Sequence, residues 1–287
     1  MEYITKGFVK RLLPLRNQDT NKNDYGRVLA ICGCTGYTGA AYFSAQSAVL
    51  TGSGIVTLAI PSSIYNILAC KLNEPVIKPI TCDESGKFCL ESYDELISLA
   101  EKADAVLIGC GIGRSDSLDK LVHKLVLSIS CPIILDADGI NAFSGHIDLL
   151  SKCKSQIILT PHMGEFKRLT ENNVSNFGEY AFKFVRDSKC ILLLKSHRTN
   201  VLSPLGKHMQ NTTGNAGMAK GGSGDVLSGI ILSLIGQGLS PYNATCAGAW
   251  IHGACGDYCA KKLGQYSMTP TDMLNALPKI LLDIVGH

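Results

Sequence analysis

Five glycines and an aspartate fall within twelve residues in the last third of the 287-residue chain. The segment reads Gly214-Asn-Ala-Gly-Met-Ala-Lys-Gly-Gly-Ser-Gly224, and Asp225 follows it. Glycines leave backbone N–H groups unshielded, and a helix beginning here adds the partial positive charge of its N-terminus. We therefore predict a site that binds the phosphates of a nucleotide. The alternative is a Gly-rich turn that only lets a helix pack closely.

Asp225 is the candidate catalytic residue of this segment. The helix dipole and the exposed N–H groups stabilise a carboxylate at this position, so we expect Asp225 to be ionised at neutral pH. An ionised carboxylate beside bound phosphates can deprotonate a hydroxyl group for phosphoryl transfer. The alternative role for Asp225 is that of a simple helix N-cap.

Two familiar nucleotide-binding signatures do not fit the chain. Lys220 precedes the two central glycines, whereas the lysine of a Walker A loop follows the last glycine. Gly33, Gly36 and Gly39 miss the G-x-G-x-x-G spacing by one residue, which disfavours a Rossmann NAD site. Another glycine group runs from Gly109 to Gly113. Each of these two turns either contacts a ligand or is only a tight strand-to-helix connection.

Further polar residues follow apolar runs of the sequence. His162 stands after Pro161, which fixes a turn, and we expect His162 to contact ligand; a structural histidine is the alternative. Asp136 and Asp138 either help to hold a metal-bound phosphate or serve turn chemistry. The segment Lys195-Ser-His-Arg-Thr199 offers donors to a nucleotide's phosphate or ribose, unless its charges are only solvated.

The elements that must position these residues are short, continuous apolar runs, which indicate strands buried on both faces of a parallel sheet. We predict strands at Arg27 to Ile31, Ile55 to Ile60, Ala105 to Ile108, Pro132 to Leu135, Ile157 to Thr160 and Cys190 to Leu194. Candidate helices are Gly39 to Thr51, Ser62 to Leu72, Ser92 to Lys102, Ser117 to Ser128 and Phe177 to Asp187.

The order of these elements predicts one three-layer α/β domain. A hairpin-like stretch, His197 to Gln210, follows the last predicted strand, and helices should dominate the remainder. One of them begins near Asp225 and ends at Gly236 or Gly238, with its apolar residues on one buried face. Ligands of parallel α/β sheets bind at the carboxyl ends of the strands, where the polar residues above are expected to meet.

Charge and composition narrow the function classes. Lysines and arginines number 27 against 24 acidic residues, and no block of like charges suggests nucleic-acid binding. The apolar runs are far shorter than the roughly 20 residues of a membrane span, and the first fifteen residues do not resemble a signal peptide, so we expect a cytoplasmic protein. The twelve cysteines form no CxxC pair, which predicts reduced thiols and no zinc site.

With the order of motifs established, nearly the whole chain resembles the ADP-dependent NAD(P)H-hydrate dehydratases, a ribokinase-like family of metabolite repair enzymes. The matching stretches are Gly26 to Gly33, Tyr37 to Ala41, Gly109 to Gly113, Leu135 to Asp138, Thr160 to Glu165, Lys195 to Thr199 and Asn215 to Gly229. Departures are Ala216, where the family often has Pro, Lys220, where Thr is usual, and Cys32 and Cys34 beside Gly33.

The resemblance implies a ribokinase-like three-layer α/β/α fold and dehydration of the (6S) hydrates of NADH and NADPH, with ADP (or ATP) as co-substrate and Mg²⁺ screening its phosphates. ADP would yield AMP and phosphate. Substrate contacts would come from Ala40, Gly113, His162 and Asp225, with Asp225 activating the hydroxyl. Nucleotide contacts would come from Lys195, Ser196, His197, Arg198, Thr199, Asn215, Gly221, Gly222, Ser223 and Gly224.

Other expectations concern partners and rival functions. The resemblance implies a homotetramer and a separate epimerase as pathway partner, because the chain leaves room for only a short lead before the matched region. A ribokinase-like kinase of a vitamin precursor alcohol, of the hydroxyethylthiazole or hydroxymethylpyrimidine type, is the rival enzyme. An adenine-nucleotide sensor without turnover is the rival outside catalysis.

Overall fold

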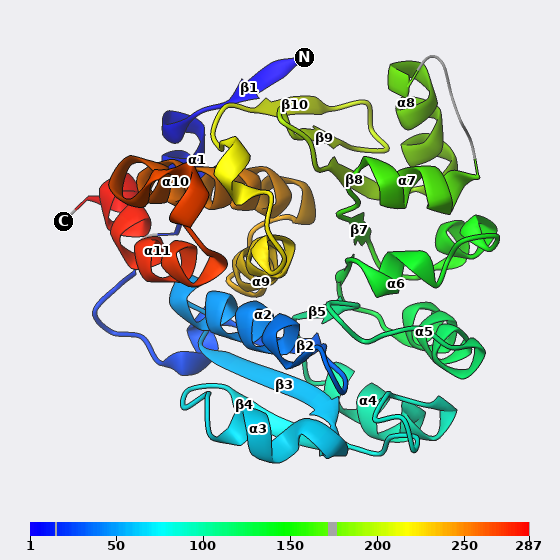
Figure 1. The fold of residues 1–287 in the computed structure, drawn as a ribbon. Helices are drawn as coiled ribbons and strands as arrows, with labels where there is room; N and C mark the ends of the chain where they lie inside the picture. Colours follow the sequence, from blue (N-terminus) through cyan, green and yellow to red (C-terminus); the bar gives the residue numbers. More distant parts are fainter. Residues whose placement is uncertain (15, 172–176, 287) are drawn as a thin grey trace.

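A single sheet of ten strands forms the middle layer of the protein (Figure 1). The computed structural model describes residues 1–14, 16–171 and 177–286. Across the sheet the order is β1-β10-β9-β8-β7-β6-β5-β2-β3-β4. The strands are β1 (Glu2–Ile4), β2 (Arg27–Ile31), β3 (Ile55–Pro61), β4 (Val76–Ile80), β5 (Ala105–Ile108), β6 (Ile133–Leu135), β7 (Ile157–Leu159), β8 (Ile191–Leu194), β9 (Asn200–Leu202) and β10 (His208–Asn211).

The pairing confirms the prediction of a mostly parallel sheet. Strands β2 to β8 pair in parallel, whereas β9 is antiparallel to both β8 and β10. The six predicted strands are present within one or two residues of their predicted ends, and the hairpin-like stretch is the β9–β10 hairpin. Strands β1 and β4 were not predicted: each lies at an edge of the sheet, and Lys78 and Pro79 interrupt the apolar pattern of β4.

Helices cover both faces of the sheet, which makes three layers (Figure 1). One face carries α1 (Lys6–Leu12), α2 (Thr38–Thr51), α3 (Tyr65–Ala69), α9 (Ser223–Gly236), α10 (Pro241–Ser267) and α11 (Pro270–Val285). The other carries α4 (Tyr93–Ala100), α5 (Asp116–Ser128), α6 (Asp138–Asn141), α7 (Met163–Thr170) and α8 (Phe177–Ser188). Each face has its own hydrophobic core, so the three-layer prediction is confirmed.

Helix α9 is the central helix of its layer. The prediction of a single buried face was too narrow, because every residue from Val226 to Ile235 is buried. The helix packs against α2, α10 and the sheet at once. Gly229 permits the approach to α2, since a Cβ atom there would lie 2.0 Å from the hydroxyl oxygen of Ser47. This packing fixes the N-terminus of α9, and with it Asp225, above the sheet.

The sheet reverses its order between β2 and β5. From β2 the chain continues to β3 and β4 on one side, and it then returns to place β5 on the other side of β2. Such a switch point leaves a crevice at the carboxyl ends of the two strands. Here the crevice is lined by the turns after β2 and β5, which are joined by a hydrogen bond from the N–H of Gly33 to the carbonyl of Cys110 (2.8 Å).

Two further findings concern the cysteines and the helices. All twelve cysteines are free thiols, and eight of the twelve are buried in the structure. Among the described residues, no helix combines the length and the apolar character needed to cross a membrane.

Candidate active site

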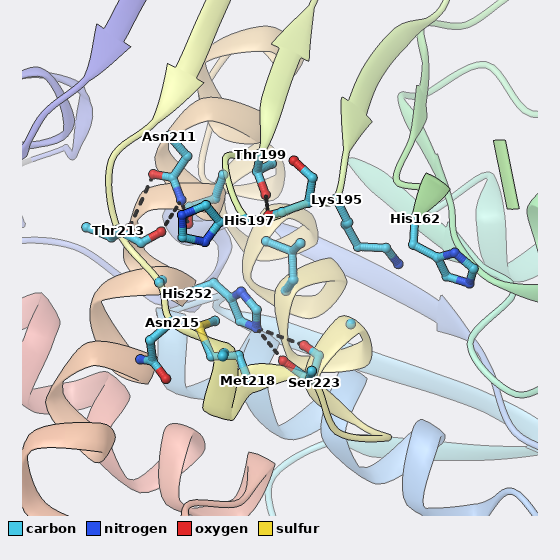
Figure 2. A pocket seen from close by; sticks show the side chains of 18 of the residues that line it. His162, Lys195, His197, Thr199, Asn211, Thr213, Asn215, Met218, Ser223 and His252 are labelled. Carbon is cyan, nitrogen blue, oxygen red and sulfur yellow. Dashed lines mark hydrogen bonds between the residues drawn. The ribbon is translucent and has the colours of Figure 1, made fainter. Parts of the chain in front are cut away.

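A cavity of about 610 Å³ opens beside the N-terminus of α9, at the carboxyl end of β8 (Figure 2). This volume is in the range of small-ligand sites. Predicted site residues that line it are His162, Lys195, Ser196, His197, Thr199, Asn215, Ser223 and Gly224. Predicted residues that are not among its lining are Ala40, Gly113, Arg198, Gly221, Gly222 and Asp225. The structure therefore brings together most of the predicted nucleotide residues and places the others around them.

The Gly-rich segment supplies fewer free N–H groups than its sequence suggested. Gly214 donates its N–H to Asp257 (2.9 Å), and Gly217 donates to the side chain of Asn215 (3.0 Å). The prediction that these two glycines hold an anion was wrong, because α10 and the short turn after Asn215 already satisfy them. In the described part of the chain, no acceptor is recorded for the N–H groups of Gly221 and Gly224.

The start of α9 is where an anion can bind. Gly222 is its N-cap, with a φ of +96° that only glycine adopts readily. Gly224 has an ordinary helical backbone, so its lack of a side chain has another reason. A Cβ atom at Gly224 would lie 3.3 Å from Nζ of Lys195 and 3.7 Å from Oδ2 of Asp136. Glycine at this position keeps open the space between a helix N-terminus and a lysine, which suits a phosphate.

Asp225 is in the first turn of α9 but is not its N-cap, so the capping interpretation was wrong. Its carboxylate faces Asp136 and Cys110, and the ligand atoms of the three side chains lie within 4.8 Å of one another. Burial, followed by the negative charge of Asp136, raises the pKa of Asp225 to about 6. Desolvation and a like charge therefore outweigh the helix dipole and the exposed N–H groups, which favour the ionised form. About nine in ten Asp225 side chains are still ionised at pH 7.

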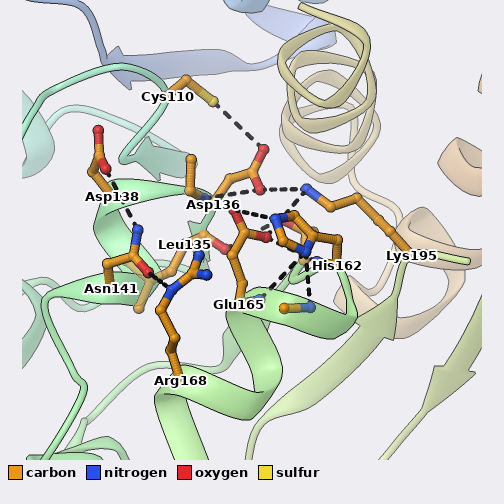
Figure 3. A network of polar contacts seen from close by, with 12 residues as sticks. Cys110, Leu135, Asp136, Asp138, Asn141, His162, Glu165, Arg168 and Lys195 are labelled. Atoms are coloured by element: carbon orange, nitrogen blue, oxygen red, sulfur yellow. Dashed lines mark hydrogen bonds and ion pairs between the residues drawn. The ribbon is translucent and has the colours of Figure 1, made fainter. Parts of the chain in front are cut away.

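Asp136 is the centre of a polar network below the cavity (Figure 3). It is buried, and its carboxylate pairs with Nζ of Lys195 at 2.9 Å and accepts from the hydroxyl of Ser228 at 2.7 Å. These partners lower the pKa of Asp136 although burial opposes them. Burial likewise opposes the charge of Lys195, but Asp136 and Glu165 raise its pKa. Both groups are therefore charged, and Asp136 is not free to hold a metal-bound phosphate.

His162 lies on the rim of the cavity, as predicted. It also has a structural role, which was the alternative to ligand contact. It is the N-cap of α7, where Nδ1 accepts from the N–H groups of Gly164 (2.9 Å) and Glu165 (3.3 Å). Nδ1 is thus an acceptor, and Nε2 lies 3.6 Å from a carboxylate oxygen of Glu165. The side chain is 53% exposed and faces the cavity (Figure 2). His162 can contact a ligand without giving up its capping bonds.

Ala40 and Gly113 mark a second part of the site, at the crevice between β2 and β5. Ala40 is in the first turn of α2, and its Cβ lies 2.8 Å from the position that a Cβ of Gly111 would occupy. Gly113 donates its N–H to Asp138 at 2.9 Å. Asp138 therefore holds the turn after β5, in agreement with the structural alternative. Cys110, in the same turn, lies 3.7 Å from the Asp136 carboxylate, which in turn pairs with Lys195 at the cavity.

Residues of α10 and of the β10 end were missed as parts of the cavity wall. They are Asn211 and Thr213 at the end of β10 and Ala249, His252 and Gly253 in α10; Met218 of the Gly-rich segment and Leu227 of α9 were missed as well. The geometry of His252 defines its tautomer: Nε2 lies 2.8 Å from the carbonyl of Ser223, and a carbonyl only accepts. Burial lowers the pKa of His252 to about 4, so the ring is neutral and Nδ1 carries the lone pair. A residue within a long helix gives no sequence signal for such a role.

Lys220 explains one departure from the family pattern. Its ammonium group donates to the carbonyls of Tyr266 (2.7 Å) and Met268 (2.6 Å), at the junction of α10 and α11. Asp257 holds the other end of the Gly-rich segment through Gly214 and Asn215. The segment is therefore fixed to α10 at both ends, which preorganises the anion site.

The described residues offer no suitable cage for Mg²⁺. The cluster of Cys110, Asp136 and Asp225 contains a thiol, which is a poor magnesium ligand, and Asp136 is committed to Lys195 and Ser228. We assign no protein ligand to a metal here. Magnesium is usually held largely by substrate phosphates, and a nucleotide bound at Gly224 would supply them.

Comparison with known proteins assigns a family to this arrangement. The family model described as NAD(P)H-hydrate dehydratase matches residues 28–279. The bifunctional NAD(P)H-hydrate repair enzyme of Moorella thermoacetica is 37% identical over 285 residues, which are 98% of this chain and 54% of that protein. The chain thus spans about half the length of the curated relatives it matches.

Solved structures agree with the family and confirm the ribokinase-like fold. The ADP/ATP-dependent NAD(P)H-hydrate dehydratase of Bacillus subtilis, co-crystallised with ATP and Mg²⁺, superposes with a TM-score of 0.85 at 26% identity, covering 99% of this chain and 98% of that chain. A ribokinase-like superfamily protein of Enterococcus faecalis gives a TM-score of 0.84 at 29% identity, covering 100% and 97% of the two chains.

Proposed function

This chain belongs to the NAD(P)H-hydrate dehydratase family, and we propose that it restores NADH and NADPH from their (6S) hydrates by a dehydration coupled to consumption of an adenine nucleotide. One observation carries the proposal. The open space at Gly224 lies against Lys195 and Asp136 at the wall of the cavity, and the carboxylate of Asp225 lies on the other side of Asp136, beside Cys110 in the turn after β5. A phosphoryl donor and a hydroxyl acceptor can therefore face each other across Asp225.

Each part of the site has a role in this reaction. The nucleotide lies in the cavity, with its terminal phosphate at the start of α9 and the segment from Lys195 to Thr199 along its side. The hydrated nicotinamide lies in the crevice near Ala40 and Gly113, with His162 on the rim. The dehydratase of Bacillus subtilis was co-crystallised with ATP and Mg²⁺. Magnesium would neutralise negative charge on the phosphates.

The chemical steps follow from these positions. Asp225 takes the proton of the substrate hydroxyl, whose oxygen attacks the terminal phosphorus and releases AMP from ADP or ADP from ATP. Lys195 stabilises the negative charge on the transferred group. Phosphate then leaves with the electron pair of the carbon–oxygen bond, and the neighbouring ring carbon loses a proton to form the double bond. A hydroxyl, which leaves poorly, is thus exchanged for phosphate, which leaves well.

The test is an assay of the purified protein with NADH hydrate and either ADP or ATP. We expect the absorbance of NADH to rise, with one AMP or ADP and one phosphate released for each NADH formed. Phosphorylation of a thiazole or pyrimidine alcohol without any NADH would overturn the proposal in favour of a vitamin-precursor kinase. Tight nucleotide binding without turnover of any of these substrates would show a sensor instead.

The pH dependence of the reaction is a second prediction. Because only the ionised form of Asp225 accepts a proton, kcat/KM should fall below the pKa of about 6, roughly tenfold for each further pH unit. The measurement is kcat/KM for the hydrate at saturating nucleotide and magnesium between pH 5 and 8. A profile that stays flat down to pH 5 would contradict the assignment of Asp225 as the base.

The remaining expectations belong to the same proposal. We propose a cytoplasmic enzyme that acts as a homotetramer and receives the (6S) hydrate with the help of an epimerase, because the (6R) form would not place its hydroxyl at Asp225. The relative from Moorella thermoacetica is a bifunctional repair enzyme. Size-exclusion chromatography with light scattering tests the tetramer.

A further inference from the structure

The buried Asp136 carboxylate lies next to the proposed base and, unlike its partner Lys195, has no part in the steps above. The Asp136 carboxylate pairs with the Lys195 ammonium at 2.9 Å, and Glu165 is 3.8 Å from the same nitrogen. Only 2% of the Asp136 side chain is exposed, against 22% of the Lys195 side chain. Nζ of Lys195 is also 3.3 Å from where a Cβ of Gly224 would lie. Lys195 thus touches both the buried acid and the phosphate site.

The backbone at Asp136 is shaped to aim this carboxylate. Ala137 has a φ of +48°, which an alanine rarely adopts, and it separates Asp136 from Asp138. Asp136 turns toward Lys195 and Ser228, whereas Asp138 turns toward the N–H of Gly113. Unfavourable backbone conformations of this kind persist where the surrounding contacts determine them, commonly at functional sites.

We propose that Asp136 is a positioning residue, which holds the Lys195 ammonium over the phosphate site and places a buried negative charge beside the Asp225 carboxylate. This inference rests on the proposed function of Asp225. Asp136 acts in this proposal through its two neighbours, Lys195 and Asp225. Its two effects come from one charge, placed between the lysine and the base.

The charged and titratable groups around Asp225 come from several elements. Cys110 follows β5, Asp136 and Asp138 follow β6, Lys195 follows β8, and Glu165 in α7 faces Lys195. His252 in α10 is neutral and bonds to Ser223 instead. The Asp136 charge raises the pKa of Asp225, and the Lys195 charge lowers it. Removal of the Asp136 charge should therefore lower the pKa of Asp225, whereas removal of the Lys195 charge should raise it.

The experiment compares Asp136→Asn, Lys195→Met and, as a matched control, Ser228→Ala, which removes a hydrogen bond from Asp136 but no charge. We expect the acid limb of kcat/KM to move to lower pH in Asp136→Asn, to higher pH in Lys195→Met, and to stay within about 0.3 pH units in Ser228→Ala. Limbs that coincide in all three variants, or that move in the same direction in the two charge variants, would overturn the proposal.

A second readout separates this proposal from the proposed function. Carbon-13 NMR of aspartate carboxyl groups, with the Asp225 signal assigned by its loss in Asp225→Asn, follows the titration in nucleotide-free protein. We expect the same opposite shifts there. Shifts without dehydratase activity would refute the proposed function and support the coupling, whereas activity with an unchanged Asp225 titration would refute the coupling alone. If Asp136→Asn does not fold, the comparison of the Asp225 titration in Lys195→Met with that in Ser228→Ala tests the proposal.

Discussion

Replacing Asp225 with asparagine should lower kcat by about 10²–10⁴-fold, the usual contribution of a general base, while ADP binds within a few-fold of the wild-type affinity. Asparagine retains the size of the side chain but cannot accept the hydroxyl proton. The nucleotide cavity does not include Asp225 among its lining residues, so binding should survive. Single-turnover kinetics and calorimetric titration with ADP measure the two effects. Turnover within tenfold of wild type would show that Asp225 is not the base.

The same substitution should stabilise the protein. The pKa of Asp225 in the folded state, about 6, is above the ordinary value of 3.8, so its contribution to stability is present below pH 4 and is lost as the pH rises through 6. At pH 7 the ionised carboxylate therefore costs up to about 3 kcal/mol, and Asp225→Asn should recover about 1–3 kcal/mol of unfolding free energy. Sites tuned for catalysis commonly carry such a cost.

Asp116→Asn is the matched control for stability. Asp116 is also in the first turn of a helix, α5, but it is exposed to solvent. There the substitution removes only a favourable interaction with the helix dipole, so it should destabilise by a few tenths of a kcal/mol. Urea unfolding at pH 7 gives both values. Equal signs for the two variants would contradict the account of Asp225.

Replacing Gly224 with valine should weaken ADP binding by about 100-fold or more, because the loss of a charge-assisted phosphate contact costs about 3 kcal/mol. The backbone of Gly224 is ordinary helix, so a side chain there needs no left-handed conformation. Its side chain would instead fill the space beside Lys195 that the phosphate requires. Calorimetric titration with ADP measures the loss.

Gly178→Val provides the comparison. Gly178 is the second residue of α8 as Gly224 is the second of α9, and no atom lies within 4 Å of a Cβ placed there. Both variants lose the same backbone freedom, but only one of them obstructs the proposed site. ADP affinity should be unchanged in Gly178→Val. If Gly224→Val also binds ADP normally, the phosphate does not bind at the start of α9.

The sheet could be predicted from sequence because its central strands are continuous apolar runs, such as Ala105–Ile108, that tolerate burial on both faces. The glycine turns could be placed on the rim because each follows such a run. Edge strand β4 was missed because an edge strand needs only a partly apolar face. In β4, Lys78 and Pro79 interrupt the apolar pattern. The local pattern of apolar residues therefore predicts central strands more reliably than edge strands.

The sequence predicted which residues form the site better than it predicted their pKa values and ion pairs. The rise in the pKa of Asp225 comes from burial and from the charge of Asp136. Asp136 is far from Asp225 in the sequence, and burial depends on the tertiary fold. The pairing of Lys195 with Asp136 is likewise a product of two strand ends meeting. His252 gave no signal, because it lies within a buried helix and its role depends on the carbonyl of Ser223. Tertiary contacts of this kind are not visible in spacing.

The central claim is that the substrate hydroxyl is phosphorylated before it leaves. The most direct test uses NADH hydrate with oxygen-18 in its hydroxyl group, together with unlabelled ADP and water, and mass spectrometry of the phosphate released. If Asp225 activates the hydroxyl for attack on phosphorus, the phosphate carries the label. Unlabelled phosphate, with oxygen-18 recovered in water, would mean that nucleotide hydrolysis and dehydration are separate reactions, and it would contradict the mechanism.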